Sequence, residues 1–136
     1  MTALILDAGA LVAVDRDDRS AVARLRAAQQ HGLELRTNAM VVAQVWRDRN
    51  GRQVNLARLL QAVDVRAVSQ RDGRDAGVLQ AAAGTSDAID ATVVLLASAG
   101  DRILTSDPAD IGRLAAAAGN RAVIVTRSAR PSASVG

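Results

Sequence analysis

The chain has 136 residues, and its charged side chains are 17 Arg, 13 Asp and a single Glu, so its formal net charge is +3. It has no Lys, no Cys and one His. This composition excludes a P-loop or Schiff-base lysine, a thiol nucleophile, a cysteine zinc site and a paired-histidine ribonuclease. Catalysis would therefore rest mainly on carboxylates, and the mildly basic balance permits a nucleic-acid partner.

The same composition indicates where the protein works. A chain without cysteine suits an intracellular protein, so we expect it in the cytoplasm. The apolar stretch 1–14 has no basic leader and is broken by Asp7, so it does not resemble a signal peptide. No apolar run approaches the roughly 20 residues that a membrane span needs.

Short apolar runs alternate with segments of helical spacing along the chain. Strands are predicted at 3–6, 33–36, 63–68, 102–105 and 122–126, and helices at 10–14, 20–30, 39–49, 54–63, 71–83, 87–98 and 108–118. This alternation implies right-handed crossovers and a three-layer α/β/α fold with a mainly parallel sheet. We expect one domain over residues 1–127 and a loose tail over 128–136. The predicted inward side chains include Met40, Val41, Val45, Trp46, Ala76, Val78 and Leu79.

Two D-x-x-D pairs, Asp87 with Asp90 and Asp107 with Asp110, stand at the starts of two predicted helices, and Asp7 ends the first strand. Sites in parallel sheets form outside the carboxyl ends of the strands, where these acids could converge. Converging carboxylates repel one another unless a cation neutralises them, and hard Mg²⁺ or Mn²⁺ takes such oxygen ligands. The pattern therefore indicates a metal site.

Helix capping is the alternative explanation for the two pairs. Asp107 with Pro108 at the first helical position is a sensible helix start. Thr85 or Ser86 could cap the predicted helix at 87–98, with Asp87 and Asp90 favouring its N-terminal dipole. Asp7 tips the balance towards a metal site, because we see no cap that the following Ala8-Gly9 requires.

Asp7, the helix around Gln44, and the runs D-A-I-D-A-T-V-V-L-L-A and I-L-T-S-D-P-A-D follow one another in that order. Over residues 3–126 the sequence resembles PIN domains, specifically the VapC-type toxins of bacterial toxin-antitoxin pairs. The resemblance implies a PIN-like fold, a homodimer, a Mg²⁺- or Mn²⁺-dependent endoribonuclease and inhibition by a cognate VapB-like antitoxin. It also implies that Asp7, Asp87 and Asp107 bind the metal.

The chain departs from the family at Gln44, where a helical Glu is usual. Glutamine offers a carbonyl oxygen without charge, so the site should hold its cation less tightly and Gln44 would orient a ligand or water. The only Glu, Glu34, lies a strand earlier and does not match that position. Asp90 is a candidate to replace the missing charge, with a capping role as the alternative, and Asp110 is interpreted as a first-turn stabiliser.

Arginines are the candidate RNA contacts, since they lie in predicted loops or helix ends where they could hold phosphates. They are Arg16, Arg19, Arg47, Arg49 and Arg52. Such charges are more often a solvated face. Trp46 is the sole aromatic residue, so base stacking cannot contribute much.

Two other functions stay open. A PIN-fold protein weakened by Gln44 could act mainly by binding RNA or an antitoxin. A receiver or phosphatase of the doubly wound type is disfavoured by the missing lysine and by the lack of a paired-Asp motif around Asp7.

Overall fold

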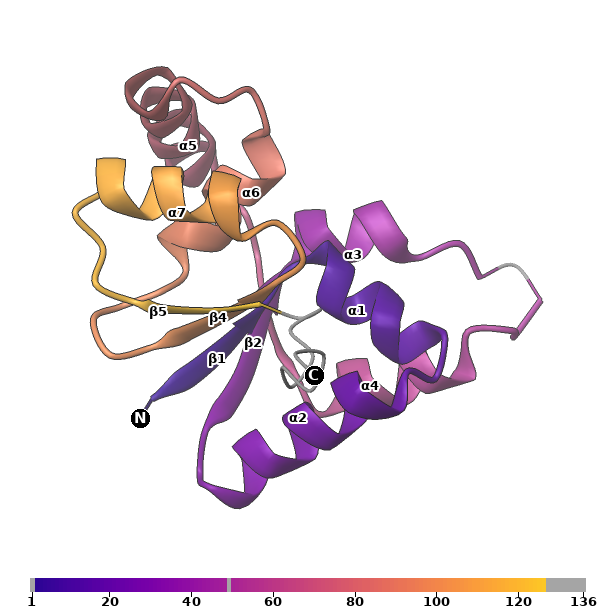
Figure 1. Cartoon of the computed structure of the whole chain (residues 1–136). Helices are drawn as coiled ribbons and strands as arrows, with labels where there is room; N and C mark the ends of the chain where they lie inside the picture. Colours follow the sequence, from indigo (N-terminus) through magenta and orange to yellow (C-terminus); the bar gives the residue numbers. More distant parts are fainter. Residues whose placement is uncertain (1, 49, 127–136) are drawn as a thin grey trace, which may run out of the picture.

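The chain forms a five-stranded sheet in the computed structural model, which describes residues 2–48 and 50–126 (Figure 1). All paired strands are parallel, in the order β3-β2-β1-β4-β5. The strands are β1 (Ala3–Leu6), β2 (Glu34–Asn38), β3 (Asp64–Arg66), β4 (Arg102–Thr105) and β5 (Val123–Thr126). The α/β class and the parallel sheet predicted from the sequence are confirmed.

Helices cover both faces of the sheet. They are α1 (Ala8–Asp15), α2 (Arg19–Gln30), α3 (Ala39–Val45), α4 (Val54–Gln61), α5 (Gln70–Ala83), α6 (Ala88–Leu95) and α7 (Pro108–Ala117). Helix α1 packs against α2 and α4 on one side, while α5, α6 and α7 pack together on the other (Figure 1). Helix α3 contacts both α1 and α6, so it joins the two helical layers.

The central strands β1 and β4 carry the core. Ile5, Leu6, Ile103 and Leu104 are at most 1% exposed, as expected for parallel strands that helices cover on both faces. From β1 the sheet grows outward through β2 and β3, whereas β4 and β5 lie on the opposite side of β1. The direction of growth therefore reverses between β1 and β4, and ligands of open parallel sheets bind at such a switch point.

Helix α3 is shorter than predicted. It ends at Val45, because Trp46 takes an extended backbone with ψ of 125°. The carboxylate of Asp48 then accepts the backbone N–H groups of residues 50 to 53, which stabilises a loop where the sequence predicted helix up to residue 49. Val41 and Val45 are buried as predicted, but Met40 and Trp46 are 43% and 37% exposed, so their predicted burial is wrong.

Helix α5 also corrects one prediction. Ala76 and Leu79 face the core as expected, but Val78 is 73% exposed. The helix turns by about 100° per residue, so Val78 cannot share the face that its neighbour Leu79 buries. The exposed Val78 is a surface residue of α5.

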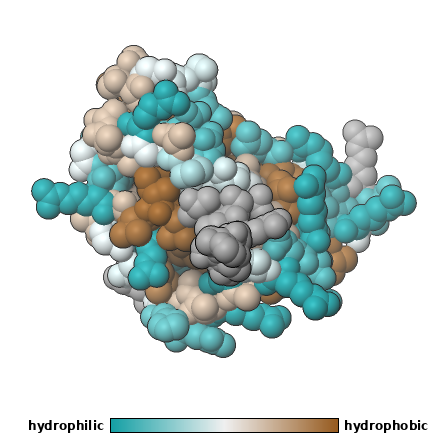
Figure 2. All heavy atoms as spheres, in the orientation of Figure 1, coloured by the Kyte–Doolittle hydropathy of each residue, from teal (hydrophilic) through white to brown (hydrophobic). Residues whose placement is uncertain are grey.

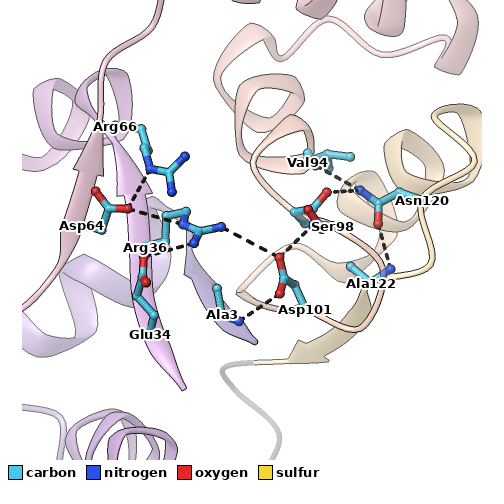
Figure 3. A network of polar contacts seen from close by, with 11 residues as sticks. Ala3, Glu34, Arg36, Asp64, Arg66, Val94, Ser98, Asp101, Asn120 and Ala122 are labelled. Atoms are coloured by element: carbon cyan, nitrogen blue, oxygen red, sulfur yellow. Dashed lines mark hydrogen bonds and ion pairs between the residues drawn. The ribbon is translucent and has the colours of Figure 1, made fainter. Parts of the chain in front are cut away.

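A charged network crosses the amino-terminal side of the sheet (Figure 3). Arg36 lies between three carboxylates, with N···O distances of 3.0 Å to Glu34, 3.6 Å to Asp64 and 4.0 Å to Asp101. The buried Asp101 also accepts the backbone N–H of Ala3 at 2.9 Å and that of residue 98 at 2.8 Å. The only Glu of the chain thus belongs to this network, in agreement with the prediction that it does not occupy the family's Glu position.

Hydrophobic side chains reach the surface over β4 and β5 (Figure 2). A hollow of about 390 Å³ between α2 and this part of the sheet is lined by apolar residues that include Leu4, Leu104 and Val125, together with Arg24 and Arg102. None of the acids that follow β1 or β4 lines this hollow. It is therefore separate from the candidate site described next.

The described part of the chain contains no helix long and apolar enough to cross a membrane. The predicted tail over residues 128–136 lies outside the described residues.

Candidate metal centre

Three aspartates begin three helices. Asp7 precedes α1, Asp87 precedes α6 and Asp107 precedes α7. Each Oδ1 accepts the backbone N–H three residues later, at N···O distances of 2.9 Å for Asp7, 2.9 Å for Asp87 and 3.3 Å for Asp107. These are N-cap hydrogen bonds, and the positive ends of the helix dipoles favour the negative charge of the acids.

The cap at Asp7 corrects the sequence argument. We expected no cap there, but Ala8 enters α1 directly after the strand and Asp7 caps that helix. Capping and metal binding are nevertheless compatible, because a carboxylate has about four acceptor positions and a cap uses one. The second oxygen of Asp7, Oδ2, accepts the backbone N–H of Ser106 at 3.3 Å. Asp7 is only 4% exposed, so both oxygens are held by protein donors.

The carboxylates that could share one ion are those of Asp90, Asp107 and Asp110. One oxygen from each lies within 4.8 Å of the others. Among the described residues this is the group whose spacing suits a metal ion, and its all-oxygen chemistry suits Mg²⁺ or Mn²⁺. Asp110 does stand in the first turn of α7 as predicted, but it also lies in this group, and Arg113 pairs with it at 2.5 Å.

The charge around Asp90 shows that the cluster is wider than these three residues. The pKa of Asp90 is raised to about 7, first by partial burial and then by the negative charges of Asp87, Asp7, Asp107 and Asp110, in that order. Asp7 and Asp87 are absent from the ion-sized group, although their charges act more strongly on Asp90 than those of Asp107 and Asp110. The five carboxylates therefore form one cluster, in which the oxygens of Asp90, Asp107 and Asp110 are close enough to share one ion.

Gln44 lies in the last turn of α3, and its side chain is exposed. It is not a member of the ion-sized group, which contains acids only. Helix α3 nevertheless contacts α6, which carries Asp90. Gln44 is therefore on an element that borders the acidic cluster.

The candidate RNA contacts lie at the opposite end of α1 from Asp7. Arg16 and Arg19 are in or next to the turn between α1 and α2, and Arg47 and Arg52 are in the loop between α3 and α4. The eight residues of α1 separate Asp7 from that end by about 12 Å. A hydrogen bond of 3.2 Å from Gln53 to Asp15 joins the loop to α1.

One of these arginines already has partners inside the protein. The Arg47 guanidinium donates to the carbonyls of Ala43 and Trp46 at the end of α3. Arg49 lies outside the described residues.

The sequence analysis missed several polar residues around the acids. Thr105 is fully buried, and its hydroxyl accepts the backbone N–H of Asp107 at 2.8 Å. Ser106 and Arg113 contact Asp7 and Asp110 as described above. Only the T-S-D-P-A-D run, which contains two of these residues, could have pointed to them.

Comparison with solved structures identifies the fold. A chain of VapBC2 from Rickettsia felis, in a crystal structure with a DNA fragment from their promoter, matches with a TM-score of 0.67 and 13% identity over 93% of this chain and 98% of that one. A chain of FitAB bound to an IR36 DNA fragment matches with a TM-score of 0.63 and 12% identity over 94% and 97%. The chain has a PIN-domain fold. The resemblance noted in the sequence is thereby confirmed as a likeness of fold.

The PIN fold also separates this chain from the receiver alternative, whose doubly wound sheet has the strand order 2-1-3-4-5. No protein-family model matches the sequence, and no curated protein matches it either. At 12 to 13% identity, the likeness to solved structures concerns the fold and carries no activity with it.

Proposed function

We propose that this PIN-fold protein is a metal-dependent endoribonuclease and the toxin of a toxin-antitoxin pair. The observation that carries the proposal is the gathering of Asp90, Asp107 and Asp110 within 4.8 Å at the switch point of the sheet, next to Asp7 and Asp87. The pKa of Asp90 near 7 reflects burial first and then the repulsion of the four neighbouring aspartates, so the ionised acids are unfavourable in the metal-free site. A divalent cation would relieve this repulsion.

The resemblance suggests Asp7, Asp87 and Asp107 as ligands, with Gln44 orienting a ligand or water. Of these, Asp107 lies close enough to Asp90 and Asp110 to share one ion with them, so we propose Asp90 and Asp110 as further ligands. Bound Mg²⁺ or Mn²⁺ supplies activation of water and stabilisation of charge on a phosphodiester. The helix caps hold the carboxylates in place before the cation arrives, so little reorganisation is needed.

A polymer suits the shape of this site. Asp87 and Asp107 are exposed, so the phosphate of an RNA backbone could reach these two acids from the solvent. The exposed Arg16, Arg19, Arg47 and Arg52 would bind phosphates further along the strand, beyond the far end of α1.

We further propose a VapB-like antitoxin as partner, a homodimer as the assembly and the cytoplasm as the location. The structures of similar fold, VapBC2 and FitAB, support the antitoxin.

The test is cleavage of a mixed RNA pool by the purified protein with Mg²⁺ or Mn²⁺, with and without a chelator. We expect cleavage that the chelator abolishes and that Asp7→Asn reduces to background, because Asn keeps the cap acceptor and removes the charge. Asp75→Asn, an exposed acid on α5, is the matched control and should cleave normally. Full activity of Asp7→Asn, or cleavage in excess chelator, would refute this mechanism.

A second candidate is a protein that binds RNA or antitoxin with little catalysis. The uncharged and exposed Gln44 favours it, because the cluster then has one acid fewer than the family pattern. In that case the wild-type protein should bind RNA without cleaving it.

A further inference from the structure

Buried polar side chains in the described part of the chain are concentrated near the acids. They are Asp7, Thr37, Asn38, Thr92, Asp101 and Thr105. Asp101 belongs to the network of Figure 3, while the others lie at the carboxyl ends of strands or in α6. Burial of a polar group is unfavourable unless its hydrogen bonds are made, so the partners of these side chains reveal what each one holds.

Thr37 ties β2 to the segment that carries Asp7. Its side chain is fully buried, and its hydroxyl donates to the carbonyl oxygen of Leu6 at 2.8 Å, across 31 residues of sequence. The peptide group that contains this carbonyl continues into Asp7. Thr37 therefore restrains the backbone directly before that acid.

Asn38 restrains the backbone directly before Asp90, and it acts through the side chain of Thr92. Its Nδ2 donates to the hydroxyl of Thr92 at 2.9 Å, across 54 residues of sequence, and that hydroxyl donates to the carbonyl of Ile89 at 2.6 Å. The Ile89 carbonyl belongs to the peptide group that continues into Asp90. Meanwhile Oδ1 of Asn38 caps α3 by accepting the N–H groups of residues 40 and 41.

We propose that Thr37 and Asn38 are positioning residues that fix the backbone at Asp7 and at Asp90, and so hold these two acids within the cluster that would bind a divalent cation. Two consecutive residues at the end of β2 thus reach the peptide groups before two acids on different elements. Neither side chain contacts a carboxylate in the contacts described, so each acts through the backbone. The inference rests on the proposed metal-dependent function.

Three substitutions remove the hydrogen bonds. Thr37→Val and Thr92→Val each replace a hydroxyl by a methyl group with little change in volume. Asn38→Ser is smaller, but it keeps an acceptor for the α3 cap and loses the amide donor. Asn120→Ala is the matched control. Asn120 donates to the carbonyls of Val94 and Ala97 at the other end of α6, so its loss loosens α6 without touching the turn of Asp90.

The first measurement is the Mn²⁺ dissociation constant of the full chain without RNA, by titration calorimetry. We expect it to rise by about 10-fold or more in Asn38→Ser and in Thr92→Val, the usual effect of losing a group that orients a ligand. Asn38 and Thr92 share one hydrogen bond, so the double variant Asn38→Ser/Thr92→Val should bind Mn²⁺ no more weakly than the weaker of the two single variants. Adding Thr37→Val to either of them should weaken Mn²⁺ binding further, because Thr37 acts through a separate hydrogen bond. Asn120→Ala should stay within about twofold of the wild type.

The second measurement uses the metal-free protein, so that it does not depend on the proposed function. In ¹H–¹⁵N spectra, Asn38→Ser should shift the amide resonance of Asp90, Thr37→Val should shift that of Asp7, and Asn120→Ala should leave both in place. The proposed function fails if the wild type binds Mn²⁺ but cleaves no RNA, or if it binds no Mn²⁺ at all. In either case these spectra still test whether Thr37 and Asn38 position Asp7 and Asp90. Folded variants with unchanged resonances at Asp7 and Asp90 would overturn the inference.

Discussion

The carboxylate of Asp7 accepts the backbone N–H of Ser106, with 3.3 Å between N and Oδ2, although the two residues are 99 positions apart. This contact joins the end of β1 to the end of β4 across the switch point. Gly9 makes it possible, because a Cβ at that position would lie 2.2 Å from the Ser106 Oγ and 2.9 Å from its Cβ. The approach of these two segments therefore depends on a residue without a side chain.

Gly9→Ala should consequently destabilise the protein, although Ala normally favours a helix over Gly by up to about 1 kcal/mol. We expect the clash with Ser106 to lower the free energy of unfolding by about 1 to 3 kcal/mol in a urea titration. Adding Ser106→Gly should recover most of that loss. Gly77→Ala in α5 is the control: its Cβ would meet nothing within 4 Å, so it should be neutral or stabilising, and an equal loss there would contradict this account.

Asp90→Asn should stabilise the metal-free protein at pH 8. The folded pKa of Asp90 is about 7, above the usual value of 3.8, so the folded state holds a proton that the unfolded state releases between these values. The stability of the wild type should then fall as pH rises from about 4 to about 7, by about 1 to 2 kcal/mol once solvent screening of this half-buried group is allowed for.

Urea titrations at pH 5 and pH 8 measure this effect, with Asp75→Asn as the variant of an exposed acid. Relative to Asp90→Asn, the wild type should lose most of this stability between pH 5 and pH 8. A parallel pH dependence in both proteins would show that Asp90 does not hold the proton.

Gln44→Glu should strengthen Mn²⁺ binding several-fold if residue 44 faces the cation, because affinity of oxygen sites rises with the number of charged ligands. The same change should lower the stability of the metal-free protein, since it adds a negative charge on the helix that borders the acidic cluster. Titration calorimetry measures the Mn²⁺ affinity. The control is Gln61→Glu, which changes an exposed residue of α4. Unchanged affinity would remove Gln44 from the site.

Asp48→Ala should loosen the loop between α3 and α4. Although desolvation opposes the shift, four backbone N–H donors, those of residues 53, 51, 52 and 50, lower the pKa of Asp48, so the carboxylate is ionised in the folded loop. Its stabilising effect is present above pH 3.8 and is lost as pH falls through the lower folded pKa. Trypsin should cut the variant faster after Arg47 or Arg52, whereas equal cutting of the wild type would contradict the role of Asp48.

The layered fold was predictable because its signals are local. Apolar runs such as Ala3–Leu6 and Arg102–Thr105 gave the strands, and the Asp107-Pro108 pair gave the start of α7. The end of α3 was misplaced because Asn50-Gly51 looks like a stop signal, whereas Asp48 captures the backbone N–H groups beyond Trp46. Hydrogen bonds from a side chain to nearby backbone N–H groups compete with the helix, and no periodic pattern in the sequence predicts them.

The candidate site was only partly predictable, because its acids could be named but their contacts could not. The N-cap at Asp7 was missed since a strand that turns directly into a helix leaves no loop residue to suggest a cap. The partners of Thr37 and Asn38 lie 31 and 54 residues away, beyond the reach of any local pattern. Which acids meet depends on strand order, and strand order is a property of the whole fold.

The caps at Asp7, Asp87 and Asp107 have a consequence for the history of such chains. Each of these acids begins a helix, so its replacement by an apolar residue costs about 1 kcal/mol of folding stability whether or not the protein cleaves anything. Selection for folding alone would therefore retain these three aspartates even in a chain of this fold that catalyses no reaction. In this fold, aspartates at these three positions are therefore no evidence of catalysis. Asp90 and Asp110 begin no helix, so acids at their positions say more about whether a chain binds a metal ion.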